Sequence, residues 1–427
     1  MTTPHAPVAA ALPLRRNRNF NLLWLGEGVS VLGTATTAVL MPLLAVTGLG
    51  AGPGWMGALT AAAWLPWLLV GLPAGAWVDR LPARPVMIAS DLVAGVALAS
   101  VPAAWAVDVL TLPHLLAIAL VNGVCTVFFR TAYVKLVVDI VASPQLEQAN
   151  GRLFGTESAM QVVGPGVGGL LAQAVTAAGG IVLDALSFLA SAFCLWRIET
   201  KSDGNRVSAP ESLRHRIRAG VAHVAGDRYL RALTVIGGLS NFGLTGITAL
   251  LVLYLVESIG LTSSLVGLVL MLSGVGGLLG ATVAARFSRR WGTGRASTWL
   301  LIASGLSALM IPLGAPGWQL AWLVAGQAMA GFCVVAGNVI RSAWRQRYVP
   351  EALMGRVITT TQMVNFGTMP LAGVVAGALG AGIGLRATIA VMAGVHAVAC
   401  VSILMTAFRP LRELPVRTDS SAARAGR

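Results

Sequence analysis

Four carboxylates within long apolar stretches of the sequence are the side chains best placed to do chemistry: Glu27, Asp91, Glu157 and Asp184. A charged side chain costs about 2.5–3.5 kcal/mol at the centre of a bilayer, so a residue kept there usually has a use. By the rise of a helix, three of them lie about 7–10 Å from one end of their stretch, and Asp184 lies near the opposite end. Because burial disfavours the charged form, a partly desolvated carboxylate can take up and release a proton when its surroundings change.

The stretches that position these carboxylates are typical of a polytopic helical membrane protein. The chain has 427 residues, of which 56% are hydrophobic and 11% are charged, and its mean hydropathy is +0.77. A soluble domain would be about a quarter charged. The net charge of +14 does not indicate a nucleic-acid partner, because the basic residues are spread among the apolar stretches and do not gather on one face. The expected partner is the lipid bilayer.

Twelve stretches are long and apolar enough to span a membrane, which takes about 20 residues each. When alternate loops and both termini are assigned to one side, that side holds 29 of the 30 Lys and Arg residues, with Arg386 as the exception. The positive-inside rule then predicts a cell-membrane protein with both termini in the cytoplasm. The predicted spans are 20–46, 54–78, 85–106, 111–132, 153–176, 179–197, 229–256, 263–286, 296–314, 317–340, 356–380 and 383–408.

The longest connection divides these spans into six and six. A basic part of it repeats Leu213, Ile217, Val221 and Val224 at helical spacing, which predicts an amphipathic helix on the inner leaflet. The predicted domains are an N-terminal half over 1–196, a cytoplasmic linker over 197–228, a C-terminal half over 229–410 and a disordered tail over 411–427.

The two halves also resemble each other in sequence. Arg130-Thr-Ala is followed by Asn-Gly-Arg152 and a Gly-Pro pair, and Arg341-Ser-Ala is followed by Met-Gly-Arg356 and a Met-Pro pair. From the last arginine to the proline is 13 residues in one half and 14 in the other. Such matched spacing indicates two repeats that cross the membrane in the same direction.

The loop between the second and third stretches carries a family resemblance. The segment Gly71–Pro85 contains Gly75, Asp79, Arg80 and Arg84 around a proline that stops the helix. It resembles the signature loop of the major facilitator superfamily, although the glycine common in that loop is absent. The resemblance implies an all-α membrane fold with twelve transmembrane helices in two parallel six-helix repeats.

The same resemblance implies that this loop gates the cytoplasmic side. A carboxylate is favourable near the N-terminal end of a helix, so Asp79 would engage the start of the eleventh helix when that side is closed. The residues assigned to gating are Gly75, Asp79, Arg80, Arg84 and Arg130.

A motif in the fifth stretch narrows the resemblance. Gly164, Pro165, Gly168 and Gly169 are similar to the antiporter motif of superfamily drug exporters, with Met160 in place of one usual glycine. Ordinary packing of small residues is the alternative. Over about 15–410, the chain resembles the branch that contains enterobactin exporters and macrolide efflux proteins. The arginine that drug exporters carry in the middle of the fourth helix is absent, so a mechanism built on that arginine is not implied.

The fold implied by the resemblance places the first, fourth, seventh and tenth helices around a central cavity, with the second, fifth, eighth and eleventh beside them. It gives Asp91 and Asp184 structural roles on peripheral helices and leaves Glu27 and Glu157 as candidates for proton coupling. Glu27 is favoured because a polar stripe continues from it toward Thr37. The alternative for each glutamate is a salt bridge to Arg130 or Arg152 that only closes the cytoplasmic side.

Neutral polar and aromatic side chains on the cavity helices form the predicted substrate site. Amides, hydroxyls and aromatic rings without a fixed charge at mid-membrane suit a neutral or amphipathic organic molecule. Hydrogen bonding between helices would explain the same amides. The predicted substrate-binding residues are Thr34, Trp64, Asn122, Thr126, Gln161, Asn241, Thr245, Gln327, Gln362 and Asn365.

These observations predict a secondary active transporter that exports a lipophilic or amphipathic small molecule, such as a drug or natural product, in exchange for protons by alternating access. An uptake permease and a non-transporting scaffold or receptor are the alternatives. A membrane-embedded enzyme is least expected, because the five histidines form no cluster and no HExxH, paired-carboxylate or Walker motif occurs. We expect no cofactor, no metal site and a monomer.

Overall fold

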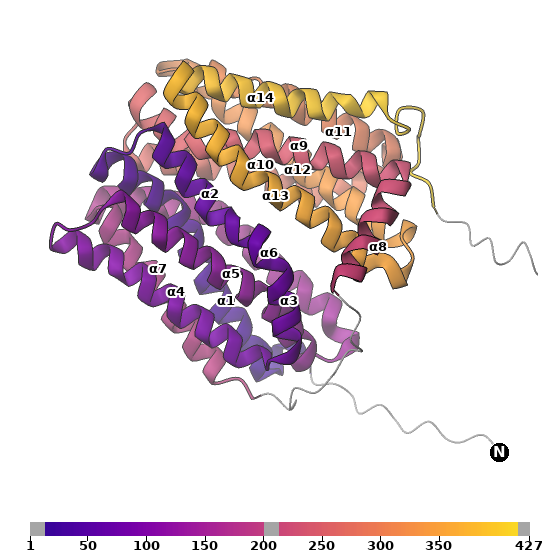
Figure 1. Ribbon diagram of the computed structural model, residues 1–427, viewed down its shortest axis with the longest axis horizontal. Helices are drawn as coiled ribbons and strands as arrows, with labels where there is room; N and C mark the ends of the chain where they lie inside the picture. Colours follow the sequence, from indigo (N-terminus) through magenta and orange to yellow (C-terminus); the bar gives the residue numbers. More distant parts are fainter. Residues whose placement is uncertain (1–12, 200–212, 417–427) are drawn as a thin grey trace, which may run out of the picture.

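The computed structural model describes residues 13–199 and 213–416, which form helices joined by short turns (Figure 1). No strand occurs in these ranges, and the predicted all-α fold is confirmed. The helices of the first half are α1 (Arg18–Leu43), α2 (Pro53–Leu69), α3 (Gly71–Arg80), α4 (Ala83–Ala106), α5 (Leu112–Ile140), α6 (Leu146–Val175) and α7 (Ala177–Trp196). Those that follow are α8 (Leu213–Gly226), α9 (Arg228–Leu253), α10 (Ser263–Trp291), α11 (Thr293–Ala308), α12 (Leu320–Tyr348), α13 (Glu351–Ile383) and α14 (Leu385–Val401).

Ten helical segments of the described chain are long and apolar enough to cross a membrane. The other two predicted spans coincide with the α2–α3 pair, which is broken into shorter pieces, and with α6, which carries charged residues in its first half. The chain is therefore a multi-pass membrane protein, and the count of twelve crossings stays a prediction.

Helix boundaries differ from the predicted spans in two ways. The second span is divided at Val70, because Pro73 has no N–H to donate to the carbonyl of Leu69. Conversely, α5 continues to Ile140 and α6 already begins at Leu146, beyond the predicted limits. Hydropathy detects only the part of a helix that crosses the bilayer, whereas polar residues continue the same helix into water.

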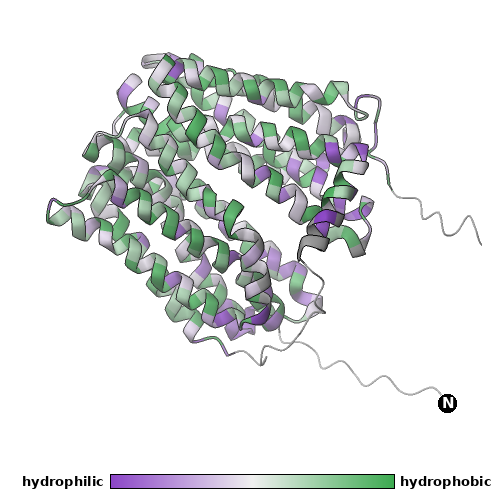
Figure 2. Ribbon diagram, viewed as in Figure 1, coloured by the Kyte–Doolittle hydropathy of each residue, from purple (hydrophilic) through white to green (hydrophobic). Residues whose placement is uncertain are grey.

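The apolar cores show that the two halves share a core at one end of the bundle only. One buried cluster combines residues of both halves, among them Leu40, Leu98 and Leu250. At the opposite end, where α3 and α8 lie, the cluster around Met87 and the cluster around Trp344 each belong to a single half. We call these the joined end and the split end. Hydrophilic residues gather near the split end (Figure 2).

Glycines allow helices of opposite halves to touch at the joined end. A Cβ at Gly373 of α13 would lie 2.7 Å from the carbonyl oxygen of Gly57 in α2. A Cβ at Gly169 of α6 would lie 2.7 Å from Cα of Gly267 in α10. At the split end, a Cβ at Gly75 of α3 would meet no described atom within 4 Å. Small residues therefore bring the halves into contact at the joined end and leave space between them at the split end.

The predicted amphipathic helix is α8, and it packs on protein at the split end. Its Gly220 lies against Arg356 and Thr360 of α13, and its Val224 is buried in the core of the second half. Residues 200–212 of the predicted linker lie outside the described residues.

The predicted disordered tail is partly ordered. Leu414 is 3% exposed, and the indole Nε1 of Trp344 donates a hydrogen bond of 2.8 Å to the carbonyl oxygen of Pro415. Residues 411–416 therefore belong to the packed second half, because a buried leucine and a tryptophan donor hold them. Residues 417–427 lie outside the described residues.

Candidate functional site

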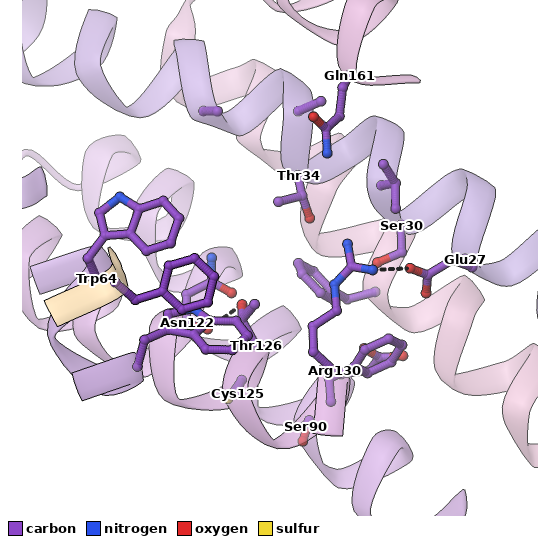
Figure 3. Close-up of a pocket in the computed structure, with 18 of the residues that line it drawn as sticks. Glu27, Ser30, Thr34, Trp64, Ser90, Asn122, Cys125, Thr126, Arg130 and Gln161 are labelled. Carbon is purple, nitrogen blue, oxygen red and sulfur yellow. Dashed lines mark hydrogen bonds and ion pairs between the residues drawn. The ribbon is translucent and has the colours of Figure 1, made fainter. Parts of the chain in front are cut away.

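A cavity of about 590 Å³ lies in the first half, close to its contact with the second. Most of its wall comes from α1, α2, α4, α5 and α6, and Phe366 of α13 contributes from the second half. The ring centroids of Trp64 and Trp67 lie 5.7 and 5.1 Å from that of Phe366, which makes one wall aromatic. In Figure 3, Trp64 lies across the cavity from Glu27 and Arg130. A space of this size and character suits an organic molecule.

Arg130 of α5 holds two carboxylates from two other helices at the cavity wall. Its Nη2 lies 2.6 Å from Oε1 of Glu157 on α6, and its Nη1 lies 3.5 Å from Oε1 of Glu27 on α1. The side chain of Glu27 is 7% exposed, that of Glu157 is 26% exposed and that of Arg130 is 34% exposed. One guanidinium thus faces two carboxylates, and the fully ionised group would carry one net negative charge. We call these three residues the ion trio.

The two carboxylates of the ion trio are held differently. Arg130 contacts both oxygens of Glu157: its Nη2 lies 2.6 Å from Oε1 and its Nη1 lies 3.5 Å from Oε2. Bidentate pairs of this kind are strong. Glu27 has the longer contact and is a cavity-lining residue, which Glu157 is not. Glu27 is therefore the carboxylate of the ion trio that faces the cavity. Across residues 13–199 and 213–416, no group of three or more His, Cys, Asp or Glu side chains is arranged to hold a metal ion.

The polar stripe predicted on α1 reaches the cavity for part of its length. Glu27, Ser30 and Thr34 line the cavity at helical spacing, whereas Thr37, one turn further on, does not. On the other side of α1, Gly33 lies against α7, where any larger side chain would collide. The close contact with α7 thus fixes the rotation of α1 that turns the stripe inward.

The predicted substrate-binding residues divide evenly between those that line the cavity and those that do not. In this conformation the second half reaches the cavity through Phe366, so the amides of its helices lie elsewhere. The lining residues are Thr34, Trp64, Asn122, Thr126 and Gln161. The residues outside the cavity are Asn241, Thr245, Gln327, Gln362 and Asn365.

Asp91 of α4 also lines the cavity, although the resemblance assigned its helix to the periphery. It is 1% exposed, and its Oδ2 has no hydrogen-bond partner among the described residues. The cavity reaches α4 because Ser30 and Cys125, which line it from α1 and α5, are small. The sequence signal for Asp91 is a carboxylate deep in an apolar helix with no basic residue one turn away, which is costly unless the group is used.

The antiporter-like motif lies where α6 touches α1 and α10. A Cβ at Gly164 or Gly168 would collide with α1, and Gly169 belongs to the joined end. Pro165 lines the cavity in the same segment. The motif therefore combines close helix packing with part of the cavity wall.

Basic side chains fix the signature loop to the first half. Arg84 donates from Nε to the carbonyl oxygen of Leu195 at 2.9 Å, at the end of α7. Lys135 of α5, which the sequence did not single out, donates from Nζ to the carbonyl oxygen of Leu81 at 2.9 Å, just past the end of α3. Cations are favourable at helix C-termini, because the last carbonyl oxygens there lack helical partners.

The gating assignments stay predictions. Gly75 and the exposed Arg80 lie at the split end on α3, while Arg130 belongs to the ion trio. The side chain of Asp79 lies outside the described residues.

The second half has an arginine that the repeat matches with Arg130, but in a different setting. Arg341 of α12 donates from Nη2 to Oδ1 of Asn338, one turn earlier on the same helix, at 2.8 Å. Its Nη1 is enclosed and has no hydrogen-bond partner in the described part of the chain. The two matched arginines therefore differ in whether carboxylates surround them.

Comparisons with known proteins agree on the family and the fold. The family model described as Major Facilitator Superfamily matches residues 23–373 and 239–426. The multidrug efflux pump Tap of Mycobacterium tuberculosis is 27% identical over 419 residues, which are 93% of this chain and 94% of that pump. The solved nucleoside transporter NupG is similar in fold, with a TM-score of 0.73 at 13% identity over 91% of this chain and 98% of that one. A bacterial homologue of the iron transporter ferroportin, in its inward-facing state, has a TM-score of 0.73 at 17% identity over 91% and 98%.

Proposed function

This chain belongs to the major facilitator superfamily and is a membrane transporter, and we propose that it exports lipophilic or amphipathic small molecules in exchange for protons. The similarity to an efflux pump supports export, because it extends over nearly the whole of both chains. The observation that carries proton coupling is the ion trio, in which Arg130 faces Glu27 and Glu157 at the cavity wall.

Proton exchange at Glu27 would change the contacts of the ion trio. An ionised Glu27 competes with Glu157 for Arg130, whereas a protonated Glu27 leaves Arg130 to Glu157 and removes the excess negative charge. A group whose contacts differ between two conformations biases the equilibrium between them. The trio connects α1, α5 and α6, so its state acts on three helices of the first half together.

The difference between the two ends of the bundle supports alternating access. If the termini are cytoplasmic, as the bias of basic residues predicts, the split end faces the cytoplasm and this conformation is inward-facing. The contacts of α2 with α13 and of α6 with α10 then form the outer seal. In this proposal the halves 1–196 and 229–410 rock against each other about that seal, and the connection 197–228 permits the motion.

The cavity supports an amphipathic substrate taken up from the cytoplasm or the inner leaflet. Trp64, Trp67 and Phe366 offer apolar contact, while Asn122 and Thr126 offer a few polar groups that orient a ligand. The proposed unit is a monomer in the cell membrane, since the cavity is built within one chain.

An efflux screen in a bacterial host stripped of its own exporters tests this function. Expression of the protein should lower the accumulation of at least one lipophilic dye or antibiotic relative to the empty vector, and an uncoupler should abolish the difference. Accumulation that rises on expression would indicate uptake instead. Export that survives the uncoupler would remove the proton from the mechanism.

A further inference from the structure

Two of the side chains that line the cavity each have one enclosed acceptor atom without a donor. Oδ2 of Asp91 on α4 and Oδ1 of Asn122 on α5 have no hydrogen-bond partner among the described residues, and both side chains line the cavity. Buried polar groups in proteins are nearly always hydrogen-bonded, because a missing partner is costly. These two acceptors therefore indicate that a donor from outside the chain completes the site.

The charges of the cavity wall do not supply that donor. Arg130 is the cation of the cavity lining, and it already contacts Glu27 and Glu157. Ser191 of α7 hydrogen-bonds to the carboxyl of Asp91 but leaves Oδ2 without a partner. The lining thus has two carboxylates, from Glu27 and Asp91, against one guanidinium.

The aromatic wall restricts the kind of donor that fits. Trp64, Trp67 and Phe366 line the same cavity, and the faces of aromatic rings attract cations as well as apolar groups. A ligand that satisfies both walls carries a positively charged N–H group on an apolar body. A lipophilic amine, protonated near pH 7, has this chemistry.

We propose that Asp91 and Asn122 form a subsite that binds the protonated amino group of an amphipathic substrate. This proposal rests on the proposed export function and specifies its substrate class. The subsite is distinct from the ion trio, because Asp91 lies on α4 and neither residue is paired with Arg130. Substrate recognition and proton exchange then use different side chains of one cavity.

The subsite would discriminate between an amine and its neutral analogue, because the neutral analogue leaves the acceptors of the subsite unpaired. A neutral analogue of the same shape can fill the aromatic side of the cavity, but it leaves the Asp91 carboxylate without a cation. Sites built to hydrogen-bond a substrate group reject analogues that lack it strongly, because the buried partner is then unsatisfied. Hydrogen bonds to charged groups are strong enough to make the preference about tenfold or more.

The test compares dansylcadaverine, a fluorescent lipophilic amine, with its N-acetyl derivative, which keeps the dye and chain but has no ammonium group. Equilibrium binding of each probe to the purified full-length protein in detergent is followed by fluorescence. We expect the wild type to bind the amine about tenfold tighter or more. In Asp91→Asn, which keeps the shape of the side chain and removes its charge, the two affinities should agree within about twofold.

Asp184→Asn is the matched control. Asp184 is also a buried carboxylate with an unpartnered Oδ2, but it lies outside the cavity lining, so its replacement should keep the preference for the amine. A preference that survives in Asp91→Asn overturns the proposal. A wild-type protein that binds the two probes equally, or binds neither, also overturns the proposal, and this outcome requires no variant. If Asp91→Asn does not fold, Asn122→Leu takes its place and should lower the preference several-fold, and an unchanged preference contradicts the subsite.

The binding test is independent of the export function. It uses no gradient, so a protein that prefers the amine but does not pump would refute export and keep the subsite. A protein that exports neutral dyes and shows no preference would refute the subsite alone.

Discussion

The two halves of this transporter have matched helices but different charges inside them. α1 and α9 each have 26 residues and each continues into a five-residue π-helical turn. At the same position, nine residues after the first, α1 has Glu27 and α9 has Gly237. The matched arginines differ accordingly, since Arg130 has two carboxylate partners and Nη1 of Arg341 has none in the described chain. Among the described residues, the buried carboxylates therefore all lie in the first half.

A matched pair of glycines shows what the repeat retains. Gly33 of α1 lies against Asp184 of α7, and Gly243 of α9 lies against His396 of α14. Any larger residue would collide at either position, so the close approach of the helices is shared. The polar groups are not shared: His396 has both ring nitrogens 3.0 Å from serine hydroxyls, whereas Oδ2 of Asp184 has no partner among the described residues. Packing is thus common to both halves, and charge is not.

Replacement of Arg130 should have the largest effect, and the matching replacement of Arg341 tests this contrast. Arg130→Gln leaves Glu27 and Glu157 without their cation in a half-buried site, so it should lower the free energy of unfolding by about 1.5–3 kcal/mol and abolish transport. Arg341→Gln removes a charge that has no carboxylate partner among the described residues, so stability should stay the same or rise. Thermal unfolding of both variants in one detergent measures the difference, and equal destabilisation would break the comparison.

At the joined end both halves contribute glycines to the helix contacts. Substitutions at the contact of α2 with α13 and at the contact of α6 with α10 should therefore have similar effects. Gly169→Val and Gly373→Val place carbon atoms where a neighbouring helix already lies, and overpacking costs about 1–3 kcal/mol. Both variants should shift the molecule toward states in which this end is open. Labelling of an introduced cysteine near the start of α2, at the joined end, from outside the cell measures that opening. Gly394→Val, where a Cβ meets nothing within 4 Å, is the control. If the cysteine stays unlabelled in both Gly169→Val and Gly373→Val, these contacts do not form the seal.

Neutralising the acidic residue of the first signature loop should have a smaller effect on the transport rate. The first contains Asp79, whereas the matching segment Ser288–Arg295 has no acidic residue. A carboxylate at a helix N-terminus contributes up to about 2 kcal/mol, so Asp79→Asn should reduce transport several-fold without changing membrane insertion. Transport rates normalised to protein in the membrane measure the effect. A rate equal to that of the wild type would remove Asp79 from the gate.

The smallest effect is expected at Glu413, an acidic residue that the second half uses outside the membrane. The amide and hydroxyl of Thr293 donate to its Oε2 at 3.0 and 2.8 Å, and these hydrogen bonds hold the pKa of Glu413 below its usual value. A lowered pKa stabilises the folded state above the unfolded value, and that stabilisation is lost as the pH falls through the lower one. The contact should therefore hold at neutral pH and weaken below about pH 4.

Hydrogen exchange at the amide of Leu414, which donates to the hydroxyl of Thr293 at 2.8 Å, measures this contact. Protection should fall on acidification in the wild type, after correction for the intrinsic exchange rate. Glu413→Gln should show reduced protection at every pH. Equal protection in the wild type at pH 7 and at pH 3.5 would mean that the glutamate does not hold the segment.

The sequence predicts the helices of this fold better than it predicts the cavity. Apolar stretches locate the spans because the bilayer requires about 20 apolar residues, and the signature loop identifies the family. The division at Pro73 and the inward position of Asp91 were missed. The first depends on a single missing N–H group, and the second on small side chains of other helices that let the cavity extend to α4. Helical periodicity gives the face of a residue on its own helix, but not the distance of that helix from the centre.

The ion trio was predictable only in part for a related reason. The cost of burying a carboxylate singles out Glu27, Asp91, Glu157 and Asp184 from sequence, and the family resemblance then leaves Glu27 and Glu157 as candidates for proton coupling. Their shared partner, Arg130, appeared as one of two possible arginines, because the choice between Arg130 and Arg152 depends on how α5 and α6 are rotated against each other. The structure brings Arg130 to both glutamates.

The measurement that tests the central claim most directly is transport by Glu27→Gln in proteoliposomes, under an imposed pH gradient and in counterflow. Glutamine keeps the shape and hydrogen bonding of Glu27 but cannot exchange a proton. The variant should lose uphill transport and keep downhill exchange, because exchange requires no net movement of protons, and Glu157→Gln serves as the comparison within the ion trio. If Glu27→Gln and Glu157→Gln both still pump uphill, neither carboxylate couples protons to transport, and the first half does not have the role assigned to it.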